Sequence, residues 1–485
     1  MEPNRMSLIR LLFIAFVLVF TNCRKTNESN GTTNFVSEHQ NEVIQKWNDL
    51  ILQIDRDAIG YRPGPGPRAL SYIGLAAYEI CVPGMPSFKS IANTWGSELA
   101  IPKLDQSKRI HWPSALNESY AFLLHNFYKN TVFVGGTGHL NNAEVHRKID
   151  ELHSNLASQY EILINPEEIK NSLEWGQSVS KLIWEWSVTD KYGHEAELNP
   201  LNNNPSKNNY YPWRKELLDG NGKAIPGIWS PTNDNGDGGM FPLWGKVRTF
   251  SITESQKLCK APIPYSNSPK SAFYSEALQV YNTCNNSISY EEKWIAEFWS
   301  DDIVGLTFSP PLRMLAIFNQ IIENESSNLE KAVEGVAKLG IALNDFGVAC
   351  WHSKWHYKVE RPENFIKREI DPQWEPLLVN KIDGVSGVTP AFPAYPSGHA
   401  TFAGGSAIIL ENIFGANYEF LDNCHALRYE FNGKPRQFNS FISAGDENAK
   451  SRVFLGVHFR MDCDAGVELG RQIASSVLNQ IQWKK

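Results

Sequence analysis

The stretch PSGHATFAGGSAIIL, Pro396 to Leu410, joins a turn to a segment of small and apolar residues. Pro and Gly favour a turn at its start, and the Ala, Gly and Ser residues that follow predict a buried helix to which another backbone comes close. The free amides and the positive dipole end of a helix N-terminus bind anions, so Ser397 and the amide of Gly398 are placed to bind an oxyanion. His399 lies beside them, where an imidazole can donate or accept a proton near neutral pH.

A second segment, ACWHSKWHYKVERP from Ala349 to Pro362, contains two cations, Lys354 and Arg361. They lie seven residues apart, which is two turns of a continuous helix, so we expect both side chains to leave one face. The usual alternative for such a pair is a solvated basic face. Because the flanking residues are mainly Trp, Tyr and Cys rather than polar, we favour a clamp for an anion.

A third segment, RVFLGVHFRMD from Arg452 to Asp462, has His458 four residues before Asp462. A helix would bring these two side chains into contact, and the carboxylate would fix the imidazole tautomer. Arg452 adds a third cation, whose planar fork suits an oxyanion. A lone histidine in such a segment is more often structural, but the three cations of the second and third segments, together with the predicted anion site at Ser397, favour a nucleophile or a metal ligand.

The patterns K-x6-RP, PSGH and SR-x5-H-x3-D together resemble the signature shared by vanadium-dependent haloperoxidases and type 2 phosphatidic acid phosphatases. The likeness runs over most of residues 40–480 and is strongest after residue 290. It implies that His458 is the axial ligand and His399 the acid/base group. The residues that the resemblance assigns to the oxyanion, vanadate or phosphate, are Lys354, Arg361, Ser397, Gly398, Arg452 and His458.

The resemblance also assigns residues around this set. Trp351 and Phe392 match positions that line the halide side in chloroperoxidase-like members. Asp301 lies where an acidic partner of the site arginine is expected, and Asp462 is the partner of His458.

One cage of cations serves both oxyanions, so other features have to separate the two branches. The phosphatase branch is largely integral to membranes, whereas no apolar run after the N-terminus approaches the roughly 20 residues of a spanning helix. We therefore expect a vanadate-dependent haloperoxidase, with hydrogen peroxide and halide as its partners and Lys354 polarising the bound peroxide. The alternative is a soluble phosphomonoester or lipid phosphatase that acts through a phosphohistidine at His458, with phosphate as substrate and no cofactor. A lipid-anchored binding protein without chemistry is a third possibility.

Apolar residues recur at helical spacing in several segments, for example at Val43, Ile44, Trp47, Leu50 and Ile51. No fixed repeat and no strand-like alternation is present, so the predicted fold class is all-α. The resemblance implies two helical bundles packed side by side, with the oxyanion site in the C-terminal bundle. We place the N-terminal helical region at 36–289 and the C-terminal catalytic region at 290–485.

The N-terminus has the pattern of an export signal. Arg5 and Arg10 come before the apolar run LLFIAFVLVF, which ends shortly before Cys23. We expect a signal peptide over 1–22, a lipid on Cys23 and a polar tether over 23–35. This predicts an exported bacterial lipoprotein in the periplasm or at the cell surface, whose only membrane contact is the lipid. A plain secretory signal or an uncleaved anchor is the competing interpretation.

Composition excludes one further class of partner. The chain has 485 residues and a formal net charge of −7, and it contains no run of basic residues. Nucleic-acid binding therefore lacks its electrostatic footprint.

Overall fold

The computed structural model describes residues 34–200, 217–230, 239–285 and 288–485. Within them helices follow one another, joined by loops and two short antiparallel strand pairs, which confirms the predicted all-α class. The predicted signal peptide, Cys23 and nearly all of the tether lie outside the described residues. Phe35–Lys485 is one unit by its internal contacts, and the boundary at 289/290 remains a prediction.

The first half of the chain forms α2 to α6, and the second half forms α7 to α14. The α-helices are α2 (Glu42–Asp57), α3 (Pro65–Cys81), α4 (Trp112–Phe127), α5 (Asn142–Leu163), α6 (Pro166–Val188), α7 (Ala272–Thr283), α8 (Tyr290–Phe298), α9 (Pro310–Asn324), α10 (Leu329–Tyr357), α11 (Pro362–Glu369), α12 (Gly398–Phe414), α13 (Phe441–Phe454) and α14 (Arg460–Gln480). The short 3-10 helices are η1 (Val36–Glu38), η2 (Val82–Gly84), η3 (Ala92–Glu98), η4 (Ala196–Leu198), η6 (Trp244–Lys246) and η7 (Glu254–Gln256). The strand pairs are β1 (Ala58–Ile59) with β2 (Val132–Phe133), in which Ala58 faces Phe133, and β3 (Phe420–Asp422) with β4 (Arg436–Phe438), in which Phe420 faces Phe438.

The N-terminal bundle is formed by α2 to α6. Helix α4 packs against α5 and α6, α3 packs against α4 and α6, and α2 contacts α4 and α5. The predicted apolar stripe of α2 faces this core, because Val43, Ile44 and Trp47 are buried. Burial of these stripes supplies the stability that isolated helices of this length lack.

The C-terminal bundle surrounds α12, which contacts α9, α10, α13 and α14. Small residues of both helices bring α14 very close to α12, as the sequence of α12 predicted. A Cβ added at Gly470 would meet the carbonyl oxygen of Thr401 at 2.2 Å, and one at Gly466 would meet that of Ser397 at 2.6 Å. The starts of α12 and α14 are therefore held in fixed positions relative to each other.

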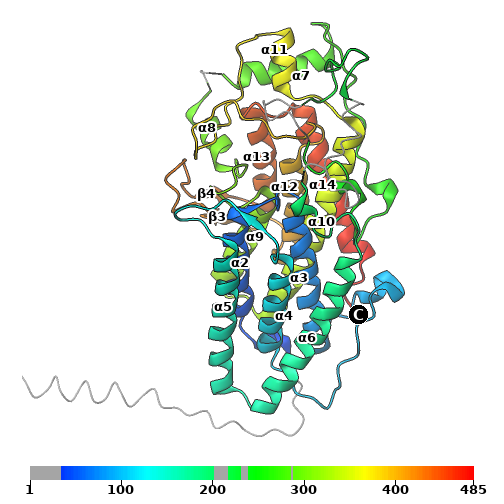
Figure 1. The fold of residues 1–485 in the computed structure, drawn as a ribbon, viewed down its shortest axis with the longest axis vertical. Helices are drawn as coiled ribbons and strands as arrows, with labels where there is room; N and C mark the ends of the chain where they lie inside the picture. Colours follow the sequence, from blue (N-terminus) through cyan, green and yellow to red (C-terminus); the bar gives the residue numbers. More distant parts are fainter. Residues whose placement is uncertain (1–33, 201–216, 231–238, 286–287) are drawn as a thin grey trace, which may run out of the picture. The chain divides into compact units, whose positions relative to one another are not determined.

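Helices α3 and α10 join the two bundles and lie side by side in the middle of Figure 1. Gly340 of α10 packs on the backbone of α3, since an added Cβ would be 2.7 Å from the carbonyl oxygen of Leu70. Gly74 of α3 packs in the same way against the carbonyl oxygen of Val336. The two bundles therefore share one core, consistent with a single unit.

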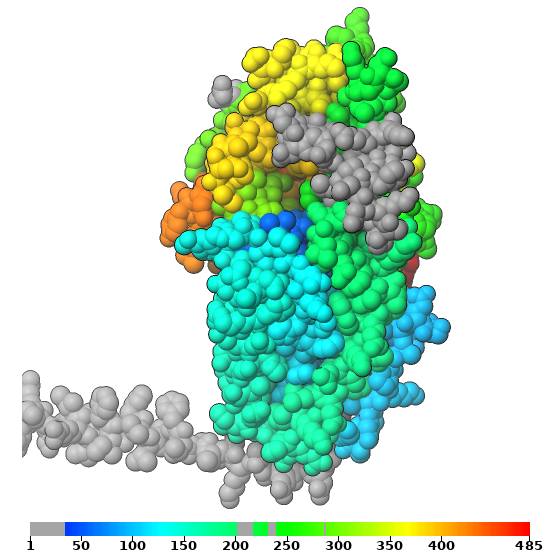
Figure 2. Space-filling view, in the orientation of Figure 1, coloured from blue at the N-terminus to red at the C-terminus, as the bar shows by residue number. Residues whose placement is uncertain are grey.

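The visible surface of this unit divides between the two halves of the chain. In Figure 2 residues of α4 to α6, cyan to green, cover one end of this face, and residues around α11, yellow, cover the other. Among the described helices, none combines the length and the apolar composition that crossing a bilayer requires.

Candidate active site

The N-terminus of α12 forms one side of the site. Ser397 is the N-cap, its hydroxyl accepts from the amide of Ala400 at 3.5 Å, and Gly398 is the first helical residue. The amide of Ser397 donates to the carbonyl of Asp462 at 2.9 Å, which ties the start of α12 to the start of α14. The predicted helix N-terminus is confirmed, and the first amides of such a helix have no intrahelical partner.

Lys354 and Arg361 reach the site from different elements, so the prediction that they share one helix face is wrong. Helix α10 ends at Tyr357, because Lys358 adopts a left-handed conformation with φ of 51°. Arg361 is instead the N-cap of α11, with Pro362 at the first helical position. The break changes the route of the chain, but both cations are fully buried.

A loop from Phe392 to Ala394 fixes both of these cations. The Nζ of Lys354 donates to the carbonyls of Pro393 at 2.7 Å and Ala394 at 2.9 Å. The Nε of Arg361 donates to the carbonyl of Phe392 at 2.9 Å. Burial lowers the pKa of Lys354 to about 7, and the neighbouring Arg361 adds to this effect. A bound anion would offset that penalty.

His458 and Asp462 are in contact, but not because both belong to one helix. His458 lies before α14, and Asp462 is at its third position, where it accepts from the amide of the N-cap Phe459 at 3.0 Å. The Nδ1 of His458 is 3.0 Å from Asp462 Oδ2, and its Nε2 is 3.1 Å from Nη1 of Arg361. Nδ1 therefore donates to the carboxylate, and Nε2 keeps a lone pair that faces the cations.

The neutral form of this imidazole dominates. Burial lowers the pKa of His458 well below its usual value, and Arg361 and Lys354 lower it further. A neutral imidazole with a fixed Nε2 lone pair is the form that ligates a metal or attacks an electrophile.

Asp302, not Asp301, is the acidic partner of the site arginine. Arg452 Nη1 is 2.9 Å from Asp302 Oδ2, and Nη2 donates to Oδ1 at 3.0 Å. Asp301 has a positive φ of 27° and directs its carboxylate to His425 at 2.9 Å instead. The prediction for Asp301 is corrected by one residue, because this backbone turn sends consecutive side chains in different directions.

His399 lies in the first turn of α12 and lines the cavity that leads to the cage. Burial lowers the pKa of His399 to about 4, and the charge of Arg452 contributes, whereas a hydrogen bond to the backbone of Ser300 opposes the shift. The imidazole is therefore neutral at neutral pH and able to accept a proton.

Trp351 and Phe392 form an aromatic wall of the same cavity, which has a volume of about 170 Å³. Their ring centroids are 4.9 Å apart, and Nζ of Lys354 is 5.1 Å from that of Phe392. The sequence did not indicate Arg62, Met240 and Phe402, which also line the cavity. None of the sequence motifs described above contains Arg62.

Buried nitrogen atoms converge on this space without partners. In the part of the chain that the structure describes, Nη2 of Arg361, Nε of Arg452 and Nε2 of His399 have no hydrogen-bond partner. Unpaired buried donors such as the two arginine nitrogens are costly unless a ligand satisfies them. The residues that the structure describes contain no group of three or more His, Cys, Asp or Glu side chains that could hold a metal cation. The donor set fits an oxyanion.

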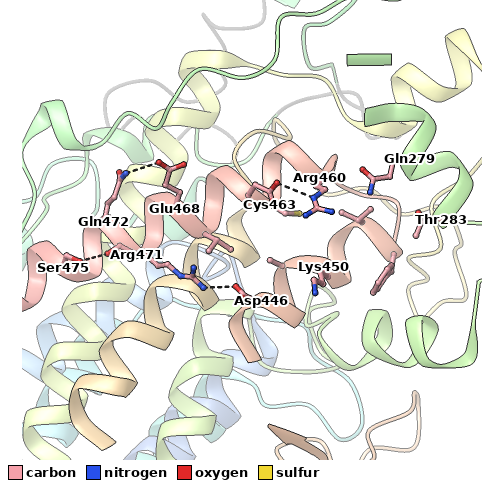
Figure 3. Close-up of a pocket in the computed structure, with 15 residues that line it drawn as sticks. Gln279, Thr283, Asp446, Lys450, Arg460, Cys463, Glu468, Arg471, Gln472 and Ser475 are labelled. Atoms are coloured by element: carbon pink, nitrogen blue, oxygen red, sulfur yellow. Dashed lines mark hydrogen bonds and ion pairs between the residues drawn. The ribbon is translucent and has the colours of Figure 1, made fainter. Parts of the chain in front are cut away.

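A larger hollow of about 770 Å³ lies on the outer face of α13 and α14 and contains none of the predicted site residues. In this hollow Arg471 pairs with Asp446 at 2.8 Å, as Figure 3 shows. Arg460 also lies 3.5 Å from Asp464. This hollow therefore has no converging excess of cations.

Comparisons with known proteins match this geometry. Residues 335–484 match the family described as the VCPO second helical-bundle domain. The vanadium chloroperoxidase of Curvularia inaequalis is 27% identical over 307 residues, 49% of this chain and 49% of that protein, so the match spans about half of the curated relative.

Solved structures extend the likeness over nearly the whole chain. The crystal structure of the first bacterial vanadium-dependent iodoperoxidase has 26% identity and a TM-score of 0.74, and the match covers 94% of this chain and 99% of that one. A holo-type bacterial vanadium-dependent chloroperoxidase, 14% identical, has the same fold with a TM-score of 0.60 over 87% of this chain and 95% of its own.

Fold and site together define a class of two-bundle helical proteins that hold an oxyanion between buried cations and a histidine. These matches show that the chain is similar in sequence and fold to vanadium-dependent haloperoxidases.

Proposed function

We propose that this protein is a vanadate-dependent haloperoxidase that oxidises halide with hydrogen peroxide. The observation that carries the proposal is the convergence of the unpartnered buried donors of Arg361 and Arg452, and of the unpartnered Nε2 of His399, around the Nε2 lone pair of His458. The similar proteins support the substrate class, because they include a chloroperoxidase and an iodoperoxidase.

The residues that would hold vanadate come from all three sequence segments. Lys354, Arg361 and Arg452 provide charge, and the start of α12 provides the hydroxyl of Ser397 and the amide of Gly398. The Nε2 of His458 would provide a direct ligand. When bound, vanadate supplies Lewis-acid activation of hydrogen peroxide at a metal that does not change its oxidation state.

The remaining residues control protons and solvent. His399 is neutral and placed at the cavity, so it accepts a proton from an incoming acid and returns it later. Lys354 provides a positive charge that stabilises negative charge developing on a bound oxygen. Trp351 and Phe392 exclude water on the side from which a halide enters.

The decisive experiment uses protein that begins after Cys23 and is stripped of oxyanion. It is assayed with hydrogen peroxide and each halide, with and without orthovanadate. Halide oxidation that depends on added vanadate is the expected result. Hydrolysis of a phosphate ester that vanadate inhibits, without halide oxidation, would instead establish a phosphatase acting through His458. Oxyanion binding without turnover in either assay would establish a binding protein.

We also propose that the protein is exported and anchored by a lipid on Cys23. The support is the apolar run from Leu11 to Phe20 with arginines before it and Cys23 shortly after it. Labelled palmitate should be incorporated into the parent protein and not into Cys23→Ser. Secretion without label would favour a plain signal peptide.

A further inference from the structure

The turn Ser300–Asp302, which follows α8, contacts the site at two points. The backbone of Ser300 accepts a hydrogen bond from the ring of His399. The carboxylate of Asp302 pairs with Arg452 through contacts of 2.9 and 3.0 Å. The position of this turn therefore fixes both the acid/base histidine and one cation of the cage.

The residue between them, Asp301, points away from the site into a buried ionic network. Its Oδ1 accepts from Nε2 of His425 at 2.9 Å, and its Oδ2 is 3.7 Å from Nη1 of Arg313. Its carbonyl accepts from Arg62 at 3.2 Å. Burial alone would raise the pKa of Asp301, but His425 and Arg313 outweigh it and lower the pKa, so the carboxylate is ionised.

Arg313 and His425 are held in turn by other elements. Nη2 of Arg313 donates to Asp422 of β3 at 2.8 Å, and its guanidinium lies 4.7 Å from the ring centroid of Phe298. His425 stacks on Phe308 with ring centroids 5.1 Å apart. The network thus connects the turn to α8, α9 and the β3–β4 loop.

Stability is a weak explanation for such a network. Buried ion pairs cost desolvation, and apolar residues of similar volume are often equally stable in their place. The network does have a geometric effect, because it fixes the one residue of the turn that does not itself face the site.

We propose that Asp301, Arg313 and His425 are positioning residues that hold the turn Ser300–Asp302 in register with His399 and Arg452. They touch neither the oxyanion nor its substrates. They set oxyanion affinity through Arg452 and proton transfer through His399. The inference deepens the proposed function and rests on it for the proton-transfer part, whereas the affinity part holds for vanadate and phosphate alike.

The test compares His425→Leu, which removes the donor to Asp301, with His425→Gln, whose amide can replace it. Affinities for vanadate and for inorganic phosphate are measured by calorimetry, and kcat and KM for hydrogen peroxide by assay. His425→Leu should lower the affinities for vanadate and for phosphate by about tenfold, which is the lower end of the effect of losing a residue that supports a ligand-binding group. It should also lower kcat by a larger factor than it raises KM. His425→Gln should restore most of the affinity.

Two further variants separate positioning from general stability. Asp190→Asn disrupts a buried pair with Arg68, at 3.0 Å, far from the predicted site residues in the sequence, and should lower the melting temperature without changing oxyanion affinity. In an Asp302→Asn background, His425→Leu should cause little additional loss of affinity, because the turn no longer acts on Arg452.

Unchanged oxyanion affinity in His425→Leu, or full additivity with Asp302→Asn, would overturn the proposal. Failure of halide oxidation in the parent protein would overturn the proposed function alone, because the phosphate affinities still decide whether the network positions the turn.

Discussion

At the scale of single residues, the site separates binding from proton transfer. His458 presents a fixed lone pair to the cations, whereas His399 faces the cavity and has an unpartnered Nε2 within the described structure. We therefore predict that substitution of His458 reduces vanadate binding, whereas substitution of His399 reduces turnover.

His458→Ala should abolish stable vanadate binding, because the proposed direct ligand would be lost. His399→Ala should still bind vanadate but lose about 10²- to 10⁴-fold in kcat, the usual contribution of a positioned acid/base group. Calorimetry measures the first and steady-state assays the second. His356→Ala, on the exposed side of α10, is the matched control. Parent-like activity in either site variant would contradict the assignment.

Glu197 makes the stability of the fold depend on pH. Burial raises its pKa to about 7 from an ordinary value near 4.5, so the folded state binds more protons than the unfolded state between these values. The stability of the parent should therefore fall as pH rises through this window. Glu197→Gln should make that slope shallower and raise the free energy of unfolding at pH 8 by on the order of 1–3 kcal/mol. Urea unfolding at pH 5 and 8 measures both effects, and Glu195→Gln, at an exposed neighbour, should behave like the parent.

Much of the candidate site could be predicted from the sequence, because each motif is local. Ser397, Gly398 and His399 follow from one helix start. The contact of His458 with Asp462 was predicted from a spacing of four within a helix, whereas the structure makes it between the residue before the N-cap of α14 and the third helical position. The choice between Asp301 and Asp302 could not be predicted, because it depends on a positive φ that no neighbouring residue demands.

At the scale of elements, the site depends on how closely α12 and α14 approach. The break after α10 shows the limit of reading elements from spacing: the left-handed Lys358 ends the helix four residues earlier than Pro362 alone would indicate. Arg361 still reaches the cage, since it caps the next helix.

Gly466→Ala should disturb this approach, because the added Cβ would lie 2.6 Å from the carbonyl oxygen of Ser397 and 2.9 Å from Cβ of Ala400. We expect a loss of about 1–3 kcal/mol in the free energy of unfolding, typical of overpacking, together with weaker vanadate binding. Thermal unfolding and calorimetry test both. Gly347→Ala on α10 is the control, since its nearest neighbour would be at an ordinary 3.4 Å. Equal behaviour of the two variants would show that this contact does not position the site.

At the scale of the whole molecule, the helical class follows from apolar periodicity, but the pairing of α3 with α10 does not. Gly74 and Gly340 make that contact although they lie some 270 positions apart in the sequence. A single glycine in a helix does not indicate which segment it packs against. The shared core explains why the predicted regions 36–289 and 290–485 need not be separable.

A fragment of residues 290–485 should therefore fail to fold cooperatively, because the face of α10 that packs on α3 would be exposed to water. Near-ultraviolet circular dichroism during urea unfolding should show no sigmoidal transition for the fragment and a clear one for residues 35–485. A cooperative transition in the fragment would establish an independent C-terminal domain.

The six cysteines of the described structure are free thiols, and all but Cys424 are buried. Burial raises the pKa of Cys259 to about 11 and that of Cys284 to about 12, so the reactive thiolate is scarce. A catalyst that releases hypohalous acid exposes its own surface to a strong oxidant. Protected sulfur would allow such an enzyme to survive many cycles of its own product.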